Sequence, residues 1–579
     1  MKFVRVNMTT QAITSQDAPA DYRTLGGRGL TSTLIYREVP PKCDPLGPEN
    51  KLVFAPGFLG GLSLVNTSRV SIGAKSPLTG GIKESNAGGK MGTALGGLGL
   101  AALIVEGQAR SGACFIIVID EKGRVRLEDG QKYRGARTYA LAEDLFRVYG
   151  PDNAVMCIGP AGEHLLSSAS IQSTDVDGRP CRSAGRGGLG AVMGAKGLKA
   201  LVVSEKGGAR PELADPLEFK EAAKVFAQAV MESPFSGKIL RAQGTAVLVG
   251  PLNAIGAFPC YNATRGYFDE WNKISGDALA EMTAKRGGQM GHQGCSRCIV
   301  HCSNIYQDAE GRYVTGSLEY ETIWALGAML GLSDLDAIAK LDFLCDDIGL
   351  DTMNAGTAMA VAMDAGRYAF GDAEAAVDLL EQAAAASEMG RLIGNGPEAV
   401  GRYFHHHRVP ACKGQSIAAY DPRGLHGNAV TYATSPQGAD HTAGNTLSTN
   451  LAAFGGKLDP TQPDGQIEAS RKAQISVAAL DCTGLCLFVG GALAGPKGGE
   501  AFHRLLKARF GEDLGPDFMP RLGRTILAVE FAFNRSAGLT PDLDRLPEFF
   551  YREPLPPNNS VVLLNNDDLA RAFADLEPI

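Results

Sequence analysis

Three cysteines lie close together at spacings that suit a metal centre: Cys295, Cys298 and Cys302. Because only two and three residues separate them, their thiolates can face one point from a single short loop. Three such thiolates are typical of a [4Fe-4S] cluster whose fourth ligand is a distant cysteine, and we predict Cys486 for that place. A zinc site completed by His292 or His301 and unligated thiols are the alternatives that the spacing leaves open.

Cys486 ends the hexapeptide Asp-Cys-Thr-Gly-Leu-Cys, and a near twin, Asp-Asp-Ile-Gly-Leu-Asp, occupies residues 346–351. In each copy an aspartate, Asp481 or Asp346, lies three residues before a glycine. Such an aspartate can accept hydrogen bonds from the N–H groups of a heterocycle, and the glycine lets the backbone approach a ligand closely. A helix C-terminus with a glycine cap is the other interpretation. The duplication suggests something bound twice beside the cluster.

A glycine-rich loop that leads into a hydrophobic strand also occurs twice. One loop contains Gly88 and precedes residues 102–105, and the other contains Gly185 and precedes residues 200–203. Equivalent residues lie 97 positions apart, and 98 apart after one inserted residue. We therefore predict a mostly β N-terminal domain with an internal pseudo-two-fold repeat.

The second loop contains a formal G-x-G-x-x-G over residues 185–190. A nicotinamide-binding fold needs a strand directly before this fingerprint, whereas the preceding segment is turn-like, so the fingerprint lacks its context. Glycine amides flanked by Arg182 and Arg186 are instead suited to a phosphate group. Arg69 and Asn86 lie near the first loop and suggest a second phosphate site.

Two ionisable residues are candidates for acid–base chemistry. Glu321 follows the cysteines in Glu-Tyr-Glu-Thr-Ile-Trp, where apolar neighbours favour a proton carrier. His441 lies in a turn-rich segment, and residues on loops often reach an active site. A structural role is the alternative for each.

Composition describes a globular protein with the character of an enzyme. The chain has 579 residues, 44% of them hydrophobic, and a formal charge of −7. The absence of basic runs interleaved with aromatics argues against a nucleic-acid partner, and no apolar run is long enough to cross a membrane. The N-terminus lacks the features of a signal peptide, so we expect a cytoplasmic protein. Its 12 cysteines are too sparse for a disulfide scaffold.

Periodicity changes along the chain and predicts an α+β fold with three domains. Short apolar strands dominate residues 1–207, which we expect to form the β-rich domain. Helical periodicity then begins near Pro216 and predicts a helical domain over 208–414, which holds the three cysteines. A turn-rich segment after Asp421 suggests a boundary, so residues 415–579 are expected to form a third, mainly helical domain with His441.

Several further stretches carry a resemblance to a known family. They begin at Gly26 (GGRGL), Asp44 (DPLGPENK), Lys75 (KSPLTG), Ser183 (SAGRGGLGAVMG), Tyr320 (YETIWALG) and Tyr420 (YDPRG). With both Asp-x-x-Gly-Leu elements, they resemble the aldehyde ferredoxin oxidoreductase family of tungsten, occasionally molybdenum, enzymes. The resemblance runs in family order from residue 1 to about 540.

The resemblance implies a β-rich base with two helical domains over it. It also implies one tungsten or molybdenum held by the dithiolenes of two pyranopterins, with Mg²⁺ bridging their phosphates, which matches the duplicated sequence. The residues implied to bind the phosphates and the bridging ion are Arg69, Asn86, Gly88, Arg182, Ser183, Gly185 and Arg186. Those implied to hold the pterins are Asp346, Gly349, Asp351, Asp481 and Leu485. The implied cluster ligands are Cys295, Cys298, Cys302 and Cys486.

Glu321 and His441 fall at the catalytic positions of the family. The implied reaction makes a carboxylate from a small aldehyde and water. Glu321 would move protons, and His441 would hydrogen-bond the carbonyl. Two electrons would then pass singly through a pterin and the cluster to ferredoxin or a ferredoxin-like subunit.

The chain also departs from the family pattern. Where homodimeric members carry a Glu-x-x-His that bridges subunits through a metal, this chain has Lys340-Leu-Asp-Phe343, so a metal-bridged homodimer is not expected. Gln437 and Ala443 replace basic residues of the pterin-binding segment. A second enzymatic hypothesis is therefore the catalytic subunit of a low-potential aromatic acyl-CoA reductase. A non-catalytic iron–sulfur electron-transfer protein is the alternative from another class.

Overall fold

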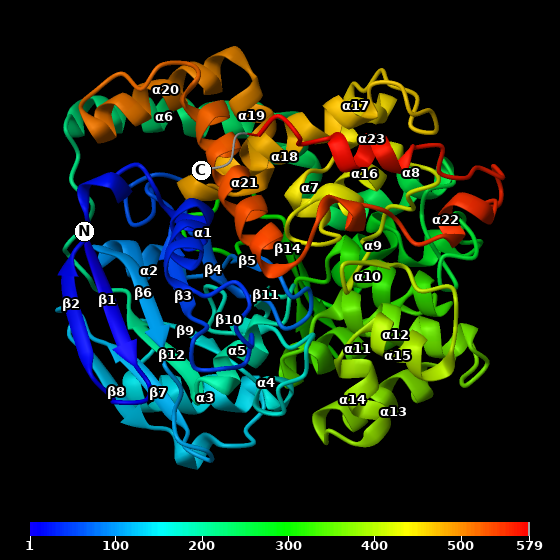
Figure 1. Ribbon diagram of the computed structural model, residues 1–579, viewed down its shortest axis with the longest axis horizontal. Helices are drawn as coiled ribbons and strands as arrows, with labels where there is room; N and C mark the ends of the chain where they lie inside the picture. Colours follow the sequence, from blue (N-terminus) through cyan, green and yellow to red (C-terminus); the bar gives the residue numbers. More distant parts are fainter. Residues whose placement is uncertain (577–579) are drawn as a thin grey trace.

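Two six-stranded sheets form the N-terminal part of the computed structural model, which describes residues 1–576 (Figure 1). The first sheet has the order β2 (Ile13–Asp17), β1 (Lys2–Asn7), β6 (Leu100–Glu106), β3 (Leu52–Pro56), β4 (Val70–Lys75) and β5 (Ile82–Ala87). The second has the order β8 (Val125–Asp129), β7 (Phe115–Ile119), β12 (Leu198–Ser204), β9 (Asn153–Cys157), β10 (Ile171–Ser173) and β11 (Arg182–Ala184). The two orders match strand for strand. The predicted repeat is confirmed and extends over both whole sheets.

Alternating side chains explain how these sheets pack. Leu103 and Val105 of β6 join one core with residues of both sheets, and the intervening Ala102 and Ile104 face the opposite side of the first sheet. The helices of this region are α1 (Gly27–Glu38) on the outer face of the first sheet, α3 (Thr138–Tyr149) on that of the second, and α2 (Met91–Gly97) and α5 (Leu189–Ala195) in the shared core. The edge strands β5 and β11 lie against each other, which brings the two glycine-rich loops together.

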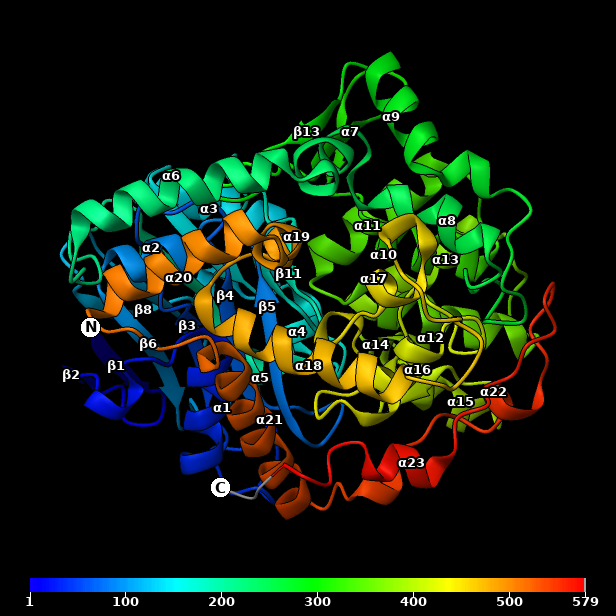
Figure 2. The ribbon, with the colours of Figure 1, turned by 90° about the horizontal axis from the view of Figure 1, so that it is seen from above.

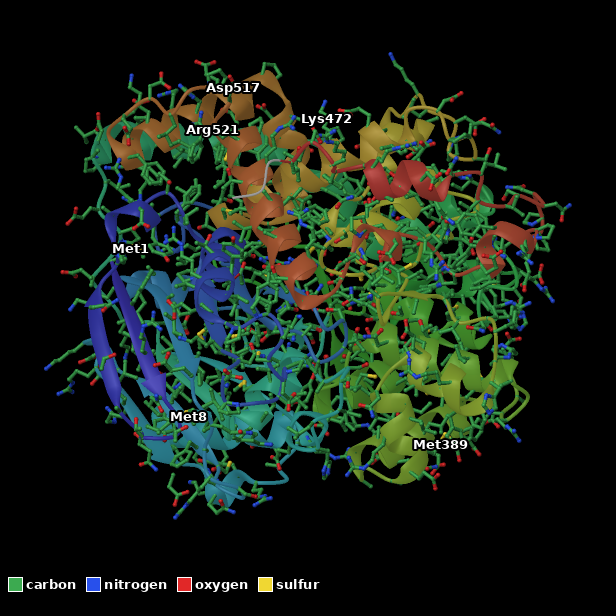
Figure 3. The ribbon with its side chains drawn as sticks, viewed as in Figure 1. Met1, Met8, Met389, Lys472, Asp517 and Arg521 are labelled. Carbon is green, nitrogen blue, oxygen red and sulfur yellow. The ribbon has the colours of Figure 1, made fainter. Side chains whose placement is uncertain are left out.

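Helices form most of the remaining described chain, in keeping with the predicted α+β class. Those that position the site are α6 (Pro216–Glu232), α10 (Tyr320–Leu326), α11 (Leu335–Ile348), α12 (Thr352–Asp364), α18 (Gln466–Thr483), α20 (Pro496–Phe510) and α21 (Phe518–Ala537). Figure 3 shows Asp517 and Arg521 at the outer end of α21, whereas Leu522 of the same helix is buried. Helix α21 therefore presents one face to the core and one to solvent. Among the described residues, no single helix has the length and apolar composition of a membrane span.

A small sheet interrupts the region that we expected to be helical. It contains β13 (Gln289–His292), β14 (Ser303–Gln307) and β15 (Tyr313–Gly316). The three clustered cysteines lie in the loop between β13 and β14. The antiparallel pairing of β13 and β14 thus fixes both ends of this loop.

The hydrophobic cores exchange segments between the regions expected to be separate domains. Helix α6 packs along α20, and both views show the two side by side (Figures 1 and 2). Six apolar residues between 546 and 569 belong instead to the core that contains α10, α11 and α12. The predicted domain boundaries near residues 207 and 414 stay a prediction, because residues from different expected domains share the same hydrophobic cores.

Candidate functional site

One cavity of about 710 Å³ lies between the edge strands of the two sheets and the helices. Its wall includes all but one of the predicted site residues: Arg69, Asn86, Gly88, Arg182, Ser183, Gly185, Arg186, Cys295, Cys298, Cys302, Glu321, Asp346, Asp351, His441, Asp481, Leu485 and Cys486. Gly349, the exception, lies behind the wall at the end of α11. Residues spread over most of the sequence therefore share one chamber.

The four cysteines line one part of this cavity. The backbone N–H of Gly89 donates to Cys295 Sγ at 3.3 Å, and Asn66 Nδ2 donates to Cys298 Sγ at 3.3 Å. Such donors stabilise ligated thiolates. In the free protein, burial raises the pKa of Cys298 to about 11, and the neighbouring Cys295 adds to the shift. A cluster bound here has to displace the thiol protons.

The spacing of the thiols argues against zinc. Tetrahedral zinc holds its sulfur ligands about 3.8 Å apart. Among the described residues, the only group of three metal-binding side chains with ligand atoms within 4.8 Å of one another is Asp175, Asp177 and His292. His292 Nε2 lies 2.9 Å from Asp177 Oδ2, and His301 Nδ1 lies 3.1 Å from the carbonyl of Gly291. Both histidines are thus engaged elsewhere, and the wider arrangement of cysteines suits a cluster of several irons.

The two aspartate motifs end two helices in the same way. Helix α11 stops at Gly349 (φ 73°) and α18 at Gly484 (φ 83°), so each glycine is a left-handed C-cap. The glycine-cap interpretation is confirmed, whereas ligand binding by Asp346 and Asp481, which line the cavity from the last turns, stays a prediction. Burial raises the pKa of Asp481 to about 8, with a contribution from Glu84. Burial likewise raises the pKa of Asp346.

The two glycine loops leave room and unpaired polar groups for a ligand. A Cβ on Gly185 would fit without a clash, with its nearest neighbour, Asp351 Oδ1, at 3.9 Å. A Cβ on Gly88 would lie 2.6 Å from Cys295 Sγ, so only glycine permits this approach. Six buried atoms of the cavity wall have no hydrogen-bond partner among the described residues, and two of them, Arg186 Nε and Asp351 Oδ2, lie 3.6 Å apart; the others are Asn86 Oδ1, Arg182 Nε, Glu321 Oε1 and His441 Nδ1. Donors and acceptors without partners beside two glycine loops fit a large polar cofactor with anionic groups.

Glu321 and His441 meet across the cavity. Glu321, in the first turn of α10, accepts the Ala419 N–H through Oε2 at 2.9 Å and places Oε1 3.2 Å from His441 Nε2. His441 Nδ1 is buried without a hydrogen bond, and the Tyr420 ring lies 5.8 Å from the imidazole. The carboxylate is thus fixed by one oxygen and available through the other.

The sequence prediction missed several charged residues of the wall. Arg28 donates to Glu530 at 2.9 and 2.8 Å and lies 3.5 Å from Asp481. Gln437 donates to Glu530 at 3.1 Å and accepts the Glu84 N–H at 2.8 Å. Gln437, which stands where the family pattern has a basic residue, therefore joins Glu530 to the backbone of Glu84 through its uncharged amide, beside the buried Arg28. Arg28 lies within the GGRGL stretch, which was the one available signal for it.

Comparisons with known proteins agree with this architecture. The family model "Aldehyde ferredoxin oxidoreductase, N-terminal domain" matches residues 3–205, and the model of its domains 2 and 3 matches residues 221–572. The tungsten-containing aldehyde ferredoxin oxidoreductases of Thermococcus kodakarensis and Pyrococcus furiosus are 33% and 32% identical to this chain. Each alignment covers 99% of this chain and 95% of the relative.

More distant relatives have other activities. The WOR-like subunit of an aliphatic sulfonate oxidoreductase of Pyrococcus furiosus is 27% identical over 79% of this chain and 77% of its own length. The solved BamBC active-site complex of benzoyl coenzyme A reductase superposes with a TM-score of 0.82 at 19% identity, over 99% of this chain and 94% of that one. This likeness shows a shared fold. The two family models together span most of the sequence, and the chain belongs to the aldehyde ferredoxin oxidoreductase family of oxidoreductase enzymes.

Proposed function

We propose that this enzyme oxidises an aldehyde to a carboxylate with a tungsten or molybdenum bis-pyranopterin, and passes the electrons through a [4Fe-4S] cluster to ferredoxin or a ferredoxin-like subunit. The observation that carries the proposal is the convergence of Glu321 and His441 on the cavity lined by four cysteines and both aspartate motifs. Relatives at about one-third identity over nearly the whole chain are tungsten-containing aldehyde ferredoxin oxidoreductases.

The wall residues divide into three groups of proposed roles. Arg69, Asn86, Arg182 and Arg186, with the glycine loops, would bind the pterin phosphates and a bridging Mg²⁺. Burial raises the pKa of Asp346 and Asp481, which favours carboxyl groups that can donate as well as accept hydrogen bonds to the pterin rings. The bound metal cofactor would supply the two-electron redox chemistry and an activated oxygen, and the cysteines would hold the cluster.

Glu321 and His441 would act on the substrate. His441 can donate a hydrogen bond to the carbonyl oxygen and increase the positive character of its carbon. Glu321, held by the Ala419 N–H, can accept a proton at Oε1 as the aldehyde and water become a carboxylate and release two electrons. The 3.2 Å separation of Glu321 Oε1 and His441 Nε2 allows a proton to move between them.

The proposal is tested by metal analysis of anaerobically purified protein together with aldehyde-dependent reduction of a viologen dye. We expect about four irons per chain and tungsten or molybdenum in the same preparation. Glu321→Gln should lower turnover about 100- to 10,000-fold while iron content stays unchanged. The exposed Glu310→Gln is the matched control.

Each other outcome points to a different function. Cofactor without aldehyde turnover would favour the acyl-CoA reductase hypothesis, and iron without tungsten, molybdenum or pterin would favour a non-catalytic electron-transfer protein. Zinc in place of iron would contradict the cluster itself.

A further inference from the structure

A buried ion pair next to His441 takes no part in the roles proposed above. Lys83 Nζ, from β5, lies 2.8 Å from Oδ2 of Asp440, the residue that precedes His441. The Lys83 side chain is 1% exposed and that of Asp440 is 8% exposed. Asp440 lines the cavity, whereas Lys83 does not. Because a buried charge is costly without a partner, each of these two residues depends on the other.

The second glycine-rich loop packs against the stem of this lysine. Gly187 has a φ of 84°, and a Cβ there would lie 2.4 Å from Lys83 Cγ and 2.8 Å from Lys83 Cδ. Glycine alone combines this left-handed backbone with such a close approach. Lys83 Nζ also donates to the carbonyl of Gln437 at 3.4 Å. The lysine is therefore fixed where it meets Asp440.

The Asp440 carboxylate is held at both oxygens. Oδ1 accepts the Thr442 backbone N–H at 3.1 Å and the Thr442 hydroxyl at 2.8 Å, and Oδ2 accepts from Lys83. Burial disfavours the charged form, but Lys83 and Arg186 outweigh burial and hold the pKa of Asp440 well below its usual range. Asp440 is thus an anion with a fixed orientation.

The His441 imidazole lies between two carboxylates. Its Nε2 lies 3.2 Å from Glu321 Oε1, and its Nδ1 lies 4.0 Å from Asp440 Oδ1. The Tyr420 ring, 5.8 Å away, is the neutral neighbour. Nδ1 is buried and has no hydrogen-bond partner in residues 1–576. A separation of 4.0 Å is too long for a hydrogen bond, so Asp440 acts on the ring through its charge.

The two carboxylates differ once the reaction is under way. Glu321 loses its negative charge when it accepts a proton, whereas Asp440 keeps its charge because Lys83 and Arg186 hold it ionised. Asp440 is then the carboxylate that still faces the ring. An imidazolium that donates from Nε2 to a carbonyl oxygen needs such an anion on its Nδ1 side.

Resting on the proposed function, we propose that Asp440 is a positioning residue that stabilises the charged imidazolium of His441 while its Nε2–H binds the carbonyl, and that Lys83 keeps Asp440 ionised for this role. Asp440 exchanges no proton with the substrate. Its contribution is to keep His441 a donor throughout turnover.

Asp440→Asn tests the proposal, because asparagine keeps the volume and can still accept from Thr442. We expect kcat for an aldehyde to fall about 10- to 100-fold in the loaded enzyme while KM stays within about twofold. The alkaline limb of the pH–rate profile should move to lower pH by about 1 unit or more, since the anion that favours the charged ring is gone. Lys83→Met should lower kcat by less, because Arg186 still acts on Asp440.

Asp440→Asn leaves Lys83 buried without its partner, so the variant could lose stability as well as activity. The double variant Lys83→Met with Asp440→Asn removes both charges and should show the same loss of kcat as Asp440→Asn alone. A cycle with His441→Gln separates the two effects: in that background Asp440→Asn should change the residual kcat by less than about twofold, because no imidazole remains to be stabilised.

Asp544→Asn is the matched control. Lys413 Nζ lies 2.6 Å from Asp544 Oδ1, both side chains are buried, and neither lines the cavity. This variant should keep the wild-type kcat and pH profile. An unchanged pH profile in Asp440→Asn, or losses that multiply in the cycle with His441→Gln, would overturn the role of Asp440 while aldehyde oxidation stands. A wild type loaded with metal and iron that oxidises no aldehyde would overturn the proposed function and this inference with it.

Discussion

The two halves of the cofactor cavity share a scaffold and differ in the residue that ends each aspartate motif. At one half, the carbonyl of Gly484 accepts the backbone N–H of Arg69, the residue before β4, at 3.2 Å. At the other, the carbonyl of Gly349 accepts the backbone N–H of Ser170, the residue before β10, at 2.9 Å. Because β4 and β10 are equivalent strands, each helix end docks on its own sheet through the same contact.

The halves diverge two residues after the glycine. Asp351 accepts the Met353 N–H, which begins α12, and lies 3.6 Å from Arg186 Nε. Cys486 occupies the equivalent position of the other half and lies in the wall with the three clustered cysteines. The duplicated backbone thus places both motif ends in the cavity wall, where Asp351 lies beside Arg186 and Cys486 lies with the other three cysteines.

The largest effect should follow from exchanging these two residues. Cys486→Asp removes one thiolate, and we expect iron to fall from about four to below about one per chain, with loss of dye reduction. Asp351→Cys should not create a second cluster, because its half lacks the other three thiols. It should cost about 1 kcal/mol through loss of the helix cap.

Iron analysis and electron paramagnetic resonance of the reduced protein measure the outcome. Retention of a full cluster in Cys486→Asp would contradict the proposed difference between the two halves, since aspartate and cysteine would then be interchangeable at the end of this motif.

The second-largest effect should be a loss of stability on substitution of Gly57 and Gly159, the glycines that contact the ends of α18 and α11. A Cβ on Gly57 would lie 1.9 Å from the Gly484 nitrogen, and a Cβ on Gly159 would lie 2.3 Å from the Ile348 carbonyl oxygen. We expect Gly57→Ala and Gly159→Ala each to lower the free energy of unfolding by about 3 kcal/mol. Urea unfolding of the two variants should show matching losses, with Gly208→Ala as a control in open space. A loss at one site alone would show that the halves are not equivalent in packing.

The smallest of the three effects concerns the buried aspartate of the second motif and depends on pH. The pKa of Asp481 is about 8 in the folded protein, against about 3.9 in an unfolded chain. Because folding raises this pKa, the carboxyl stabilises the protein fully below about pH 4, and the contribution is lost as the pH rises towards 8. In cofactor-free protein, Asp481→Asn should therefore gain stability over wild type from about pH 5 to about pH 8, by about 1–3 kcal/mol at the upper end.

Urea unfolding at several pH values measures this difference, with the exposed Asp464→Asn as the control. Asp346→Asn should shift stability in the same direction, since burial also raises the pKa of Asp346. A difference between wild type and Asp481→Asn that does not change with pH would contradict the protonated state.

The parts of the site that could be predicted from the sequence are those marked by residues close to one another in the chain. The cysteine spacing and the glycine that stops each helix are local signals, and both led to segments that line one cavity. The pairing of Arg28 with Glu530 joins residues 502 positions apart, which no local pattern encodes. The sheet around the cysteines escaped prediction because β13 (QMGH) and β14 (SNIYQ) lack the apolar alternation of a half-buried strand.

Synthesis of the chain sets an order on the completion of the cavity. Its wall runs in sequence from Arg28 to Gly491, and both sheets are already complete at Ser204. The ribosome releases the N-terminus first, so a partly synthesised chain can fold both six-stranded sheets. Such a chain has only the part of the cavity wall that the sheets supply. The wall segment that contains Cys486 is synthesised only after more than four-fifths of the 579 residues. We therefore expect cofactor loading to follow synthesis of Cys486, because a shorter chain lacks part of the wall that encloses the cavity.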